Sequence, residues 1–460
     1  MPLILPGNVG SATAATGFNV ANSVRFNRGD AAYMHKTPSS AGNVDVWTFS
    51  AWIKIAETGG HRNIFAQKGG DGTSQRTYIL LNSSGQVYVS QYTGSASNFQ
   101  LVPNRLLRDE SAWYHIVVAI DTTQATDTNR LKLYINGVQE TSFESITYPS
   151  QNLDTYVNAA NQPMAVGYDP KVSSRHFGGY MAEVVLIDGQ QLAPDQFGEF
   201  DSDSGIWKPI DVSDLTFGTN GFYLDFEDSS NLGNDANGGT DLTEVNLAAT
   251  DQSTDTCTNN FSTMNPLSSN MTLTEGNLNV ADPGNAVSTF SVASGKWYVE
   301  MKATNDQNYN PIVGIATDNS TAVTNPLSDD YPGNFAESHG YDRTGTITSS
   351  NATNQGSLTT SQDDGDIIGL AVDLDSGTKT AQWYVNGSSV GSAVTLVSSE
   401  SYVFMTYASG SQAGTGAWNF GSPSYANSSG NADGNGFGNF EYAPPSGFLA
   451  LCTKNLGSNG

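Results

Sequence analysis

Apolar and polar residues alternate with a period of two along most of residues 23–200 and again beyond residue 265. Stretches such as "VWTFSAWIKI", "GQVYVSQY" and "AWYHIVVAID" run apolar or alternate, and clusters of Gly, Asn, Asp or Ser separate most of them. This pattern is typical of short antiparallel strands joined by tight turns. We find no convincing amphipathic helical stripe. The pattern therefore predicts an all-β fold, either a sandwich or a barrel.

Two Asn-Gly pairs, Asn136-Gly137 and Asn386-Gly387, follow similar apolar stretches, "LYINGVQE" and "WYVNGSSVG". Asn-Gly supplies the two positive-φ positions of a type I′ turn, which favours a β-hairpin. We therefore predict one hairpin in each half of the chain and assign neither Asn to a binding site.

The composition divides the chain into four parts. Residues 1–22 are small and Gly/Ala-rich and form an N-terminal arm, either disordered or docked on a partner. Residues 23–200 form a first sandwich and residues 265–460 a second one. Residues 201–264 read as an acidic linker, in which "GFYLDFED" predicts a strand that returns to pair with the first sheet.

Charge excludes several functions. The 460 residues include 45 acidic and 19 basic side chains, which gives a formal charge of −26. We therefore expect no nucleic-acid partner. The N-terminus has no basic segment of a secretory signal, and no apolar stretch is long enough to span a membrane, so we expect synthesis in a cytoplasm. Cys257 and Cys452 are expected to be free thiols.

Several motifs resemble known families. "TFSAWIKI", "LYINGVQ" and "FGGYMAEVVLIDGQQL" resemble the laminin-G-like, concanavalin-type lectin module, although Ala182 stands where that module usually has an Asp. "GKWYVEMK", "GDIIGLAVDLDSGTKTAQWYVNG" and "AWNFG" resemble a SPRY domain. The resemblance implies two antiparallel jelly-roll-like β-sandwiches in tandem. The pairing of the two modules resembles virion proteins of marine bacteriophages.

Catalysis and metal binding each have candidate residues. Concanavalin-type glycoside hydrolases need two carboxylates on one strand face, and the nearest match is Asp225 and Glu227 in "YLDFED". A solvated strand edge explains this pair better, and we expect no catalytic residues. Asp169 and Asp188 are candidate calcium ligands, or turn-forming residues before Pro and Gly. Calcium is the only cofactor that we consider.

Glycan or receptor binding has two candidate groups of residues. Tyr88 and Tyr92 share one face of a predicted strand, with Arg76 and His176 in nearby loop-like segments, so they form either a platform for sugar rings or cross-strand packing. In the second sandwich the candidates are Tyr309, Tyr331 and Arg343.

These observations favour a noncatalytic phage virion protein, such as a surface appendage, fibre or decoration protein, that is released by lysis. Its arm would dock on other virion proteins, and its sandwiches would contact host glycan or a receptor. We expect a homo-oligomer, with a trimer as the usual state of fibre-like appendages. The alternatives are a carbohydrate-binding or glycan-degrading protein and a bacterial adhesin.

Overall fold

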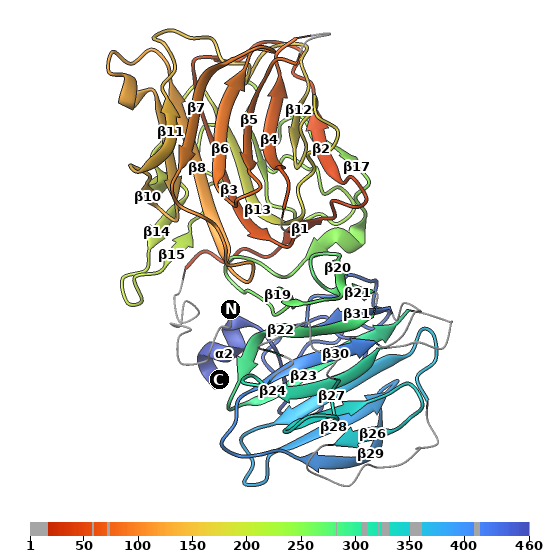
Figure 1. The fold of residues 1–460 in the computed structure, drawn as a ribbon. Coiled ribbons are helices and arrows are strands. Elements are labelled where there is room, and N and C mark those ends of the chain that lie inside the picture. The colour runs from red at the N-terminus through yellow and green to blue at the C-terminus, as the bar shows by residue number, and fades with distance from the viewer. Residues whose placement is uncertain are drawn as a thin grey trace. The chain divides into compact units, whose positions relative to one another are not determined.

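The computed structural model describes residues 17–57, 59–70, 74–281, 283–304, 311–320, 323, 331–349, 361–408 and 415–459. Strands dominate these residues, and they belong to two compact units, one ending at Thr258 and the other beginning at Asn259 (Figure 1). Each unit holds two antiparallel sheets, which confirms the predicted all-β fold of two sandwiches. Most of the predicted N-terminal arm, residues 1–16, lies outside the described residues.

The first sandwich begins with a sheet built around two long central strands. In spatial order this sheet contains β10 (Val138–Gln139), β9 (Leu131–Ile135), β8 (Trp113–Asp121), β3 (Val46–Ile55), β13 (Gly179–Asp188), β1 (Ser23–Phe26) and β18 (Gln252–Ser253), with β16 (Phe222–Leu224) paired to β13.

The opposing sheet of the first sandwich carries the features discussed below. Its order is β11 (Phe143–Thr147), β7 (Ser97–Pro103), β6 (Val87–Tyr92), β5 (Arg76–Leu81), β4 (Arg62–Lys68), β12 (Met164–Val166), β2 (Tyr33–Lys36) and β17 (Thr243–Val245). A small hairpin of β14 (Gly198–Phe200) and β15 (Trp207–Pro209) forms a separate two-stranded sheet, and Trp207 donates a hydrogen bond to His115 of β8 over 2.9 Å.

The core of the first sandwich lies between the two sheets. Alternate residues of each strand point inward, such as Phe49 and Ile53 on β3 and Ile79 and Leu81 on β5, and all four are fully buried. Burying a side chain of this size contributes about 1.5–3 kcal/mol. The residues between them face the other way, which gives each sheet an outer face.

The segment that the sequence analysis treats as a linker lies largely inside the first unit. Three of its short strands join the first sandwich: β16 pairs with β13, β17 with β2, and β18 with β1. Residues 201–258 therefore contribute edge strands to both sheets, and the first unit extends to Thr258.

The second unit has the same general construction. One sheet contains β19 (Met264–Ser269), β22 (Gly284–Val292), β30 (Tyr402–Ala408), β24 (Ile312–Thr317), β25 (Ser338–Tyr341) and β26 (Ile347–Ser349). The other contains β20 (Thr272–Thr274), β21 (Asn279–Ala281), β31 (Gly416–Asn419), β23 (Lys296–Ala303), β27 (Ile367–Asp373), β28 (Thr380–Val385) and β29 (Ser388–Thr395), with β32 (Leu449–Ala450) beside β23. The chain ends in helix α2 (Thr453–Asn459).

The two predicted hairpins occupy equivalent places. Asn136 and Asn386 have φ values of +49° and +48°, and both following glycines have a φ of +76°, as a type I′ turn requires. Each Asn side chain also accepts a hydrogen bond from the neighbouring strand, from the backbone N–H of His115 and of Ile367 respectively. The repeated motif therefore marks the same corner of two related sandwiches.

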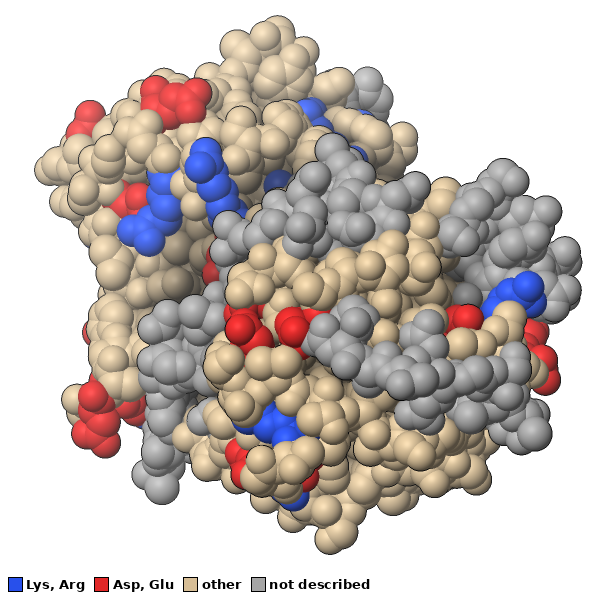
Figure 2. Space-filling view, turned by 60° about the horizontal axis from the view of Figure 1, so that its bottom comes forward, with Lys and Arg blue, Asp and Glu red and all other residues tan. Residues whose placement is uncertain are grey.

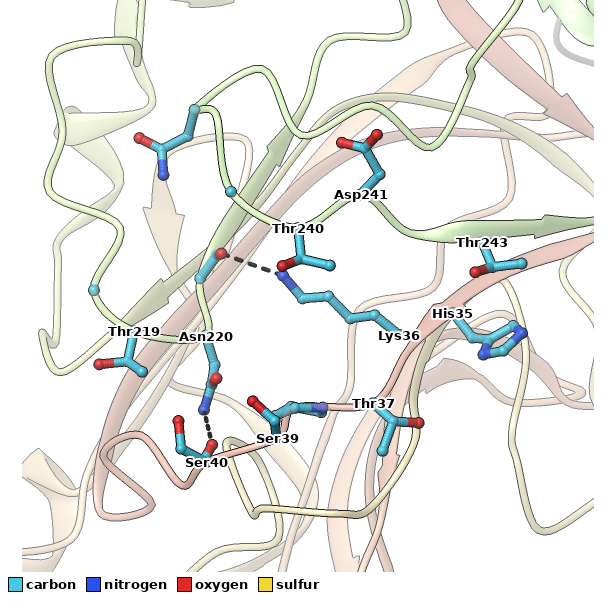
Figure 3. Close-up of a pocket in the computed structure, with 15 residues that line it drawn as sticks. His35, Lys36, Thr37, Ser39, Ser40, Thr219, Asn220, Thr240, Asp241 and Thr243 are labelled. Atoms are coloured by element: carbon cyan, nitrogen blue, oxygen red, sulfur yellow. Dashed lines mark hydrogen bonds between the residues drawn. The ribbon is translucent and has the colours of Figure 1, made fainter.

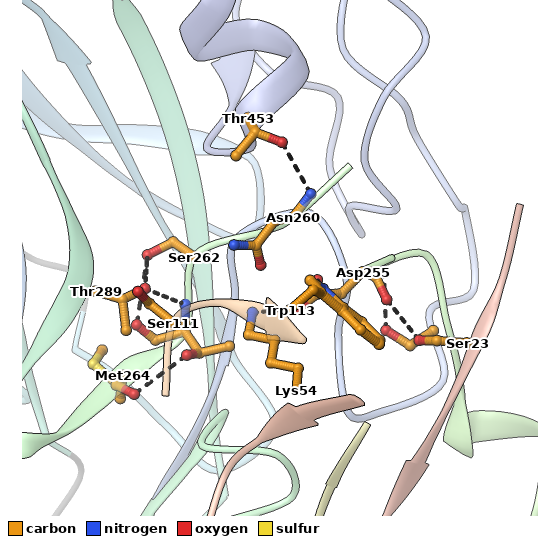
Figure 4. Close-up of polar contacts among 12 residues, drawn as sticks. Ser23, Lys54, Ser111, Trp113, Asp255, Asn260, Ser262, Met264, Thr289 and Thr453 are labelled. Carbon is orange, nitrogen blue, oxygen red and sulfur yellow. Dashed lines mark hydrogen bonds and ion pairs between the residues drawn. The ribbon is translucent and has the colours of Figure 1, made fainter. Parts of the chain in front are cut away.

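Buried polar contacts fasten the ends of each unit (Figure 4). In the first unit, Lys54 forms a 2.7 Å ion pair with Asp255, and both side chains are only 2% exposed. Trp113 donates to the same carboxylate over 3.1 Å. In the second unit, the backbone N–H of Asn260 donates to the Thr453 hydroxyl over 3.0 Å. Asp255, just before the boundary between the units, is thus bonded to the first sandwich, and Asn260, just after it, to the second.

Candidate functional site

An open pocket of about 550 Å³ lies at one edge of the first sandwich (Figure 3). The end of β2, the start of β17, the loop before β16 and the loop before β17 surround it. Most of its lining side chains carry a hydroxyl, amide, carboxylate or ammonium group, including Lys36, Ser39, Thr219, Asn220, Thr240 and Asp241.

Lys36 is the cation of this pocket. Its ammonium group lies 3.4 Å from the carbonyl oxygen of Gly221 and 4.9 Å from the centre of the Phe222 ring, and Figure 3 shows it pointing toward the loop that carries Gly221. Burial lowers the pKa of Lys36, while the nearby carboxylates of Asp235 and Asp241 oppose that change. A partly desolvated ammonium interacts more strongly with a ligand than one in bulk water.

Asp241 supplies the facing carboxylate. It accepts a hydrogen bond from the backbone N–H of Asp235 over 3.0 Å and another from the Asn231 amide over 2.9 Å. These two bonds lower the pKa of Asp241, so its carboxylate is ionised at neutral pH. The side chain is exposed at the rim, where its remaining lone pairs face solvent.

Asn220 fixes the inner wall of the pocket. Its amide nitrogen donates to the backbone carbonyls of Ser40 and Asn158, over 3.1 and 3.3 Å, and its backbone N–H donates to Asp188 over 3.0 Å. Asn220 is 7% exposed, so these bonds set the position of the loop before the ligand arrives. The pocket is therefore largely preformed.

Asp188, a predicted calcium ligand, holds these loops together. Its carboxylate also accepts hydrogen bonds from the backbone N–H of Asn43 and from the Asn158 amide, over 2.7 and 3.1 Å. The described residues contain no group of three or more His, Cys, Asp or Glu side chains placed to hold a metal ion. The hydrogen bonds from these loops explain why Asp188 is buried at this position. Calcium binding by Asp188 stays a prediction.

Asp169, the second predicted calcium ligand, is fully buried in a cluster of cations. Its carboxylate lies 2.9 Å from Nε of Arg76 and 3.3 Å from Nη1 of Arg175. Arg76 is itself only 7% exposed in its side chain and packs over the rings of Tyr78 and Tyr92. Two guanidinium groups thus compensate the charge of Asp169. Arg76 therefore has a structural role in the first sandwich, in addition to its predicted role in glycan binding.

The remaining predicted glycan-binding residues of the first sandwich share the outer face of the second sheet. Tyr88 and Tyr92 are half-buried there, and Tyr88 packs edge-on against Tyr78 at 5.5 Å. His176 is 8% exposed and stacks on Tyr168 at 4.5 Å between ring centres. The structure therefore places the four candidates on one face of the sheet, where Arg76 and Tyr92 are in contact, while Tyr88 packs on Tyr78 and His176 on Tyr168.

The candidates of the second sandwich lie on separate elements. Tyr331 precedes β25 and packs against Tyr407 of β30 at 5.5 Å between ring centres. Arg343 lies in the turn between β25 and β26. Tyr309 lies outside the described residues. We therefore do not define a site in this unit.

The pair considered for glycoside hydrolysis does not lie on a strand. β16 ends at Leu224, and Phe226, between Asp225 and Glu227, has a left-handed φ of +60°. The Asp225 carboxylate accepts the backbone N–H of Glu227 over 3.1 Å. The expected shared strand face is therefore replaced by a local turn.

The sequence alone does not predict a site at Lys36, Asn220 or Asp241. Lys36 ends a short strand, and the other two lie within the acidic segment read as a linker. The returning strand at "GFYLDFED" was the available signal, because a strand that pairs with the first sandwich also brings its neighbouring loops there.

Charged groups are sparse around these features. On the face shown in Figure 2, acidic and basic side chains form small separate groups between wide uncharged areas, as expected of a chain with 14% charged residues. Within the described residues, no helix has the length and apolar character needed to cross a membrane.

Residues 28–195 match the family model described as the concanavalin A-like lectin/glucanases superfamily. The match covers most of the first sandwich and agrees with the predicted concanavalin-like lectin fold. No curated protein matches the chain.

Solved structures give likenesses in fold. The chain is similar to a putative carbohydrate binding protein from Bacteroides ovatus ATCC 8483, with 16% identity, 49% of this chain and 58% of that chain covered, and a TM-score of 0.35. It is similar to domains LG4-5 of the mouse laminin alpha1 chain, with 10% identity, 85% and 82% covered, and a TM-score of 0.29. The SPRY domain of human HERC1 gives 16% identity, 34% and 96% covered, and a TM-score of 0.26.

Proposed function

We propose that the first sandwich is a noncatalytic carbohydrate-binding module whose ligand enters the pocket between β2, β16 and β17. The observation that carries this proposal is the polar lining around Lys36, Asn220 and Asp241. A pocket of about 550 Å³ is within the range that small ligands occupy. The concanavalin-like lectin fold of residues 28–195 agrees with such a ligand.

The chemistry of the lining suits a ligand with many hydroxyl groups. Lys36 donates hydrogen bonds, the Asp241 carboxylate accepts them, and the Ser and Thr hydroxyls do both. A sugar ring offers donors and acceptors at adjacent positions, so it satisfies all three kinds of group at once. A ligand without them would leave the lining groups desolvated and unpaired, which is unfavourable.

The proposal excludes hydrolysis. Glycoside hydrolases use two carboxyl groups that flank the scissile bond. Among the residues that line this pocket, Asp241 carries the only carboxylate. We therefore expect no release of reducing ends when the full chain is incubated with polysaccharide.

Calorimetry with the full chain and a panel of neutral, amino and acidic monosaccharides and disaccharides tests the proposal. Asp241→Asn keeps the shape of the side chain but removes its charge, and we expect at least about tenfold weaker binding, because hydrogen bonds to charged groups contribute about 1.5–3 kcal/mol. Asp214→Asn is the matched control, since Asp214 is exposed in the same unit and does not line the pocket. Equal affinity of both variants, or no binding by any saccharide, would contradict the proposal.

The position of this module in a phage particle stays a prediction from the sequence. We propose a virion surface protein on the resemblance to marine phage proteins, and none of the proteins named above points to a phage. Mass spectrometry of purified particles tests it, with the expectation that the chain is present and that removing residues 1–22 prevents its incorporation.

A further inference from the structure

Three basic side chains meet at the end of the first sandwich where β2 begins. Arg28 lies in the turn before β2, His61 in the loop before β4, and Arg175 in the loop after β12. Antiparallel pairing of β12 with β2 and with β4 brings these three segments to the same end of the sheet (Figure 1). The pocket lies beyond the other end of β2, so this group is separate from it. We call Arg28, His61 and Arg175 the basic site.

Hydrogen bonds to main-chain oxygens hold Arg28 between the other two members. Nη1 of Arg28 donates to the carbonyl oxygen of Gly59 over 3.0 Å, and Nη2 donates to that of Ser174 over 3.4 Å. Gly59 lies two residues before His61, and Ser174 directly precedes Arg175. The three basic side chains therefore start from adjoining pieces of backbone.

A fourth cation, Arg62, is buried next to this site without an ion-pair partner. It is 2% exposed, its guanidinium donates to the carbonyl oxygens of Glu57 and Asn82 over 2.5 and 3.3 Å, and its Nε has no hydrogen-bond partner. Within the described part of the chain, neither Arg62 nor Arg28 forms an ion pair with a carboxylate. Both guanidinium charges thus lack the compensation that Asp169 receives.

Burial and mutual repulsion act together on these basic groups. Burial and the nearby Arg28 lower the pKa of Arg62 to about 10. Burial, followed by the charges of Arg175 and Arg62, lowers the pKa of His61. The fold therefore holds like charges close enough to disfavour one another. An anion placed between them would be attracted by several cations at once.

The carboxyl groups near the basic site do not neutralise it. Asp169 already lies between two guanidinium groups, and Glu57 accepts the backbone N–H of Arg28 over 3.2 Å. Burial raises the pKa of Glu110 to about 7, so this carboxyl group is only partly ionised at neutral pH. Four guanidinium groups thus stand against three carboxyl groups, which leaves a local excess of positive charge in a chain whose formal charge is −26.

The members of the basic site keep surface and donors for a ligand. All three are half-buried, and Arg175 retains 19% of its side-chain exposure. A guanidinium carries five N–H groups, of which Arg28 uses two for carbonyl oxygens and Arg175 one for Asp169. The remaining N–H groups match the paired oxygens of a carboxylate, sulfate or phosphate.

We infer that the basic site binds one small oxyanion, a carboxylate, sulfate or phosphate group that is free or carried by a single sugar. The acidic remainder of the chain repels a long polyanion, so the local cations favour a ligand with one charged group. This inference goes beyond the proposed function of the pocket and does not depend on it.

Calorimetry with the full chain at constant ionic strength tests the inference, with sulfate, phosphate and glucuronate as the anions and glucose as the neutral counterpart of glucuronate. We expect at least one of the three anions to bind. Arg28→Gln and Arg175→Gln should each weaken that binding at least about tenfold, because each removes charge-assisted hydrogen bonds. Asp241→Asn, in the pocket, should leave it unchanged.

The matched control is Arg130→Gln. Arg130 is also half-buried and also donates to main-chain carbonyl oxygens, but it lies between β8 and β9 of the other sheet. It should keep full anion affinity, and urea unfolding shows that each variant is folded.

Three outcomes would overturn the inference: none of the three anions binds, binding survives both Arg28→Gln and Arg175→Gln in folded protein, or Asp241→Asn removes it. Binding of neutral saccharides, and its loss in Asp241→Asn, tests the proposed function separately. Either idea can therefore fail while the other stands.

Discussion

Each sandwich places tyrosines on the outer face of one sheet. The end of the chain covers this face in the second sandwich, whereas in the first sandwich Tyr78 is buried at 5% exposed and the tyrosines around it are half-buried. In the first sandwich, Tyr88, Tyr92 and Tyr168 are half-buried and retain exposed surface. In the second, Tyr298 of β23 is 2% exposed, and the fully buried ring of Phe440 packs on it edge-on at 5.3 Å.

The cover of the second sandwich comes from the end of the chain. Phe437, Phe440 and Phe448 join Tyr298 and Tyr384 in one apolar cluster. The buried carboxylate of Glu300 fastens this segment, because the backbone N–H groups of Glu441 and Tyr442 both donate to it over 2.9 Å. A face with its own cover is core, whereas an open face is available to a ligand. This contrast agrees with the assignment of glycan binding to the first sandwich, which rests on the polar pocket around Lys36, Asn220 and Asp241.

Truncation of Phe440, the fully buried ring of the covering segment, should have the largest effect on stability. Phe440→Ala leaves a cavity beside Tyr298, and truncation of a buried Phe typically costs about 3–5 kcal/mol. Hydrogen exchange measured by mass spectrometry should show faster exchange throughout β23 and β27, with β5 and β6 as the internal control. Unchanged protection of β23 would mean that the cover is not part of the core.

Breaking the cation cluster under the open face should have the next largest effect. Arg76→Met keeps much of the apolar stem but leaves the buried Asp169 with Arg175 as its one remaining cation. We expect a loss of about 2–4 kcal/mol, somewhat less than for a fully unpaired buried charge. Urea unfolding measures it, and Arg108→Met is the control because the Arg108 side chain is exposed. Equal losses for both variants would contradict a structural role for Arg76.

The two sandwiches also differ in how they satisfy a buried glutamate. Glu300 receives donors from Tyr298, Asn419 and two backbone N–H groups, and burial raises its pKa to about 7. Glu183 lies in a bulge of β13 with a φ of +50° and receives a hydrogen bond from Tyr223 over 2.7 Å. Burial, with Asp225 and Glu227 nearby, raises the pKa of Glu183 to about 8.

Glu183 should therefore make the first sandwich less stable as pH rises. In the unfolded chain a Glu ionises near pH 4.3, while folded Glu183 keeps its proton up to about pH 8, so the folded state binds more protons between these values. The contribution of Glu183 to the free energy of unfolding is then fully present below about pH 4.3 and is lost as the pH rises through about 8. We expect Glu183→Gln to remove about 3 kcal/mol of the loss between pH 5 and pH 7.5, at about 1.36 kcal/mol per pKa unit. Exchange rates in β13 of Glu183→Gln and of the unchanged chain measure it. β23 is the control, because its own pH dependence comes from Glu300 and should be the same in both proteins. An unchanged pH profile in β13 would contradict the raised pKa.

Local patterns predicted the strands and the hairpins, because these depend on neighbouring residues. The turns at Asn136 and Asn386 follow from two residues each, and the shared face of Tyr88 and Tyr92 follows from the period of two. The pocket depends on pairings between distant segments, β2 with β17 and β13 with β16. No local pattern predicts that Lys36 contacts a loop 185 residues later in the chain. The ion pair of Arg76 with Asp169 could not be predicted for the same reason.

The smallest expected effect on stability is the one that tests the comparison most directly. Tyr88 is half-buried on the open face and donates to Gln100 over 2.7 Å, so its ring already contacts water on one side. Tyr88→Ala should cost no more than about 1 kcal/mol, mainly through the lost hydrogen bond and the edge contact with Tyr78. Denaturant unfolding of this variant beside Phe440→Ala measures the difference between an open and a covered face. A loss for Tyr88→Ala as large as for Phe440→Ala would mean that the tyrosines of the first sandwich are core residues, and the glycan-binding interpretation of that face would lose its basis.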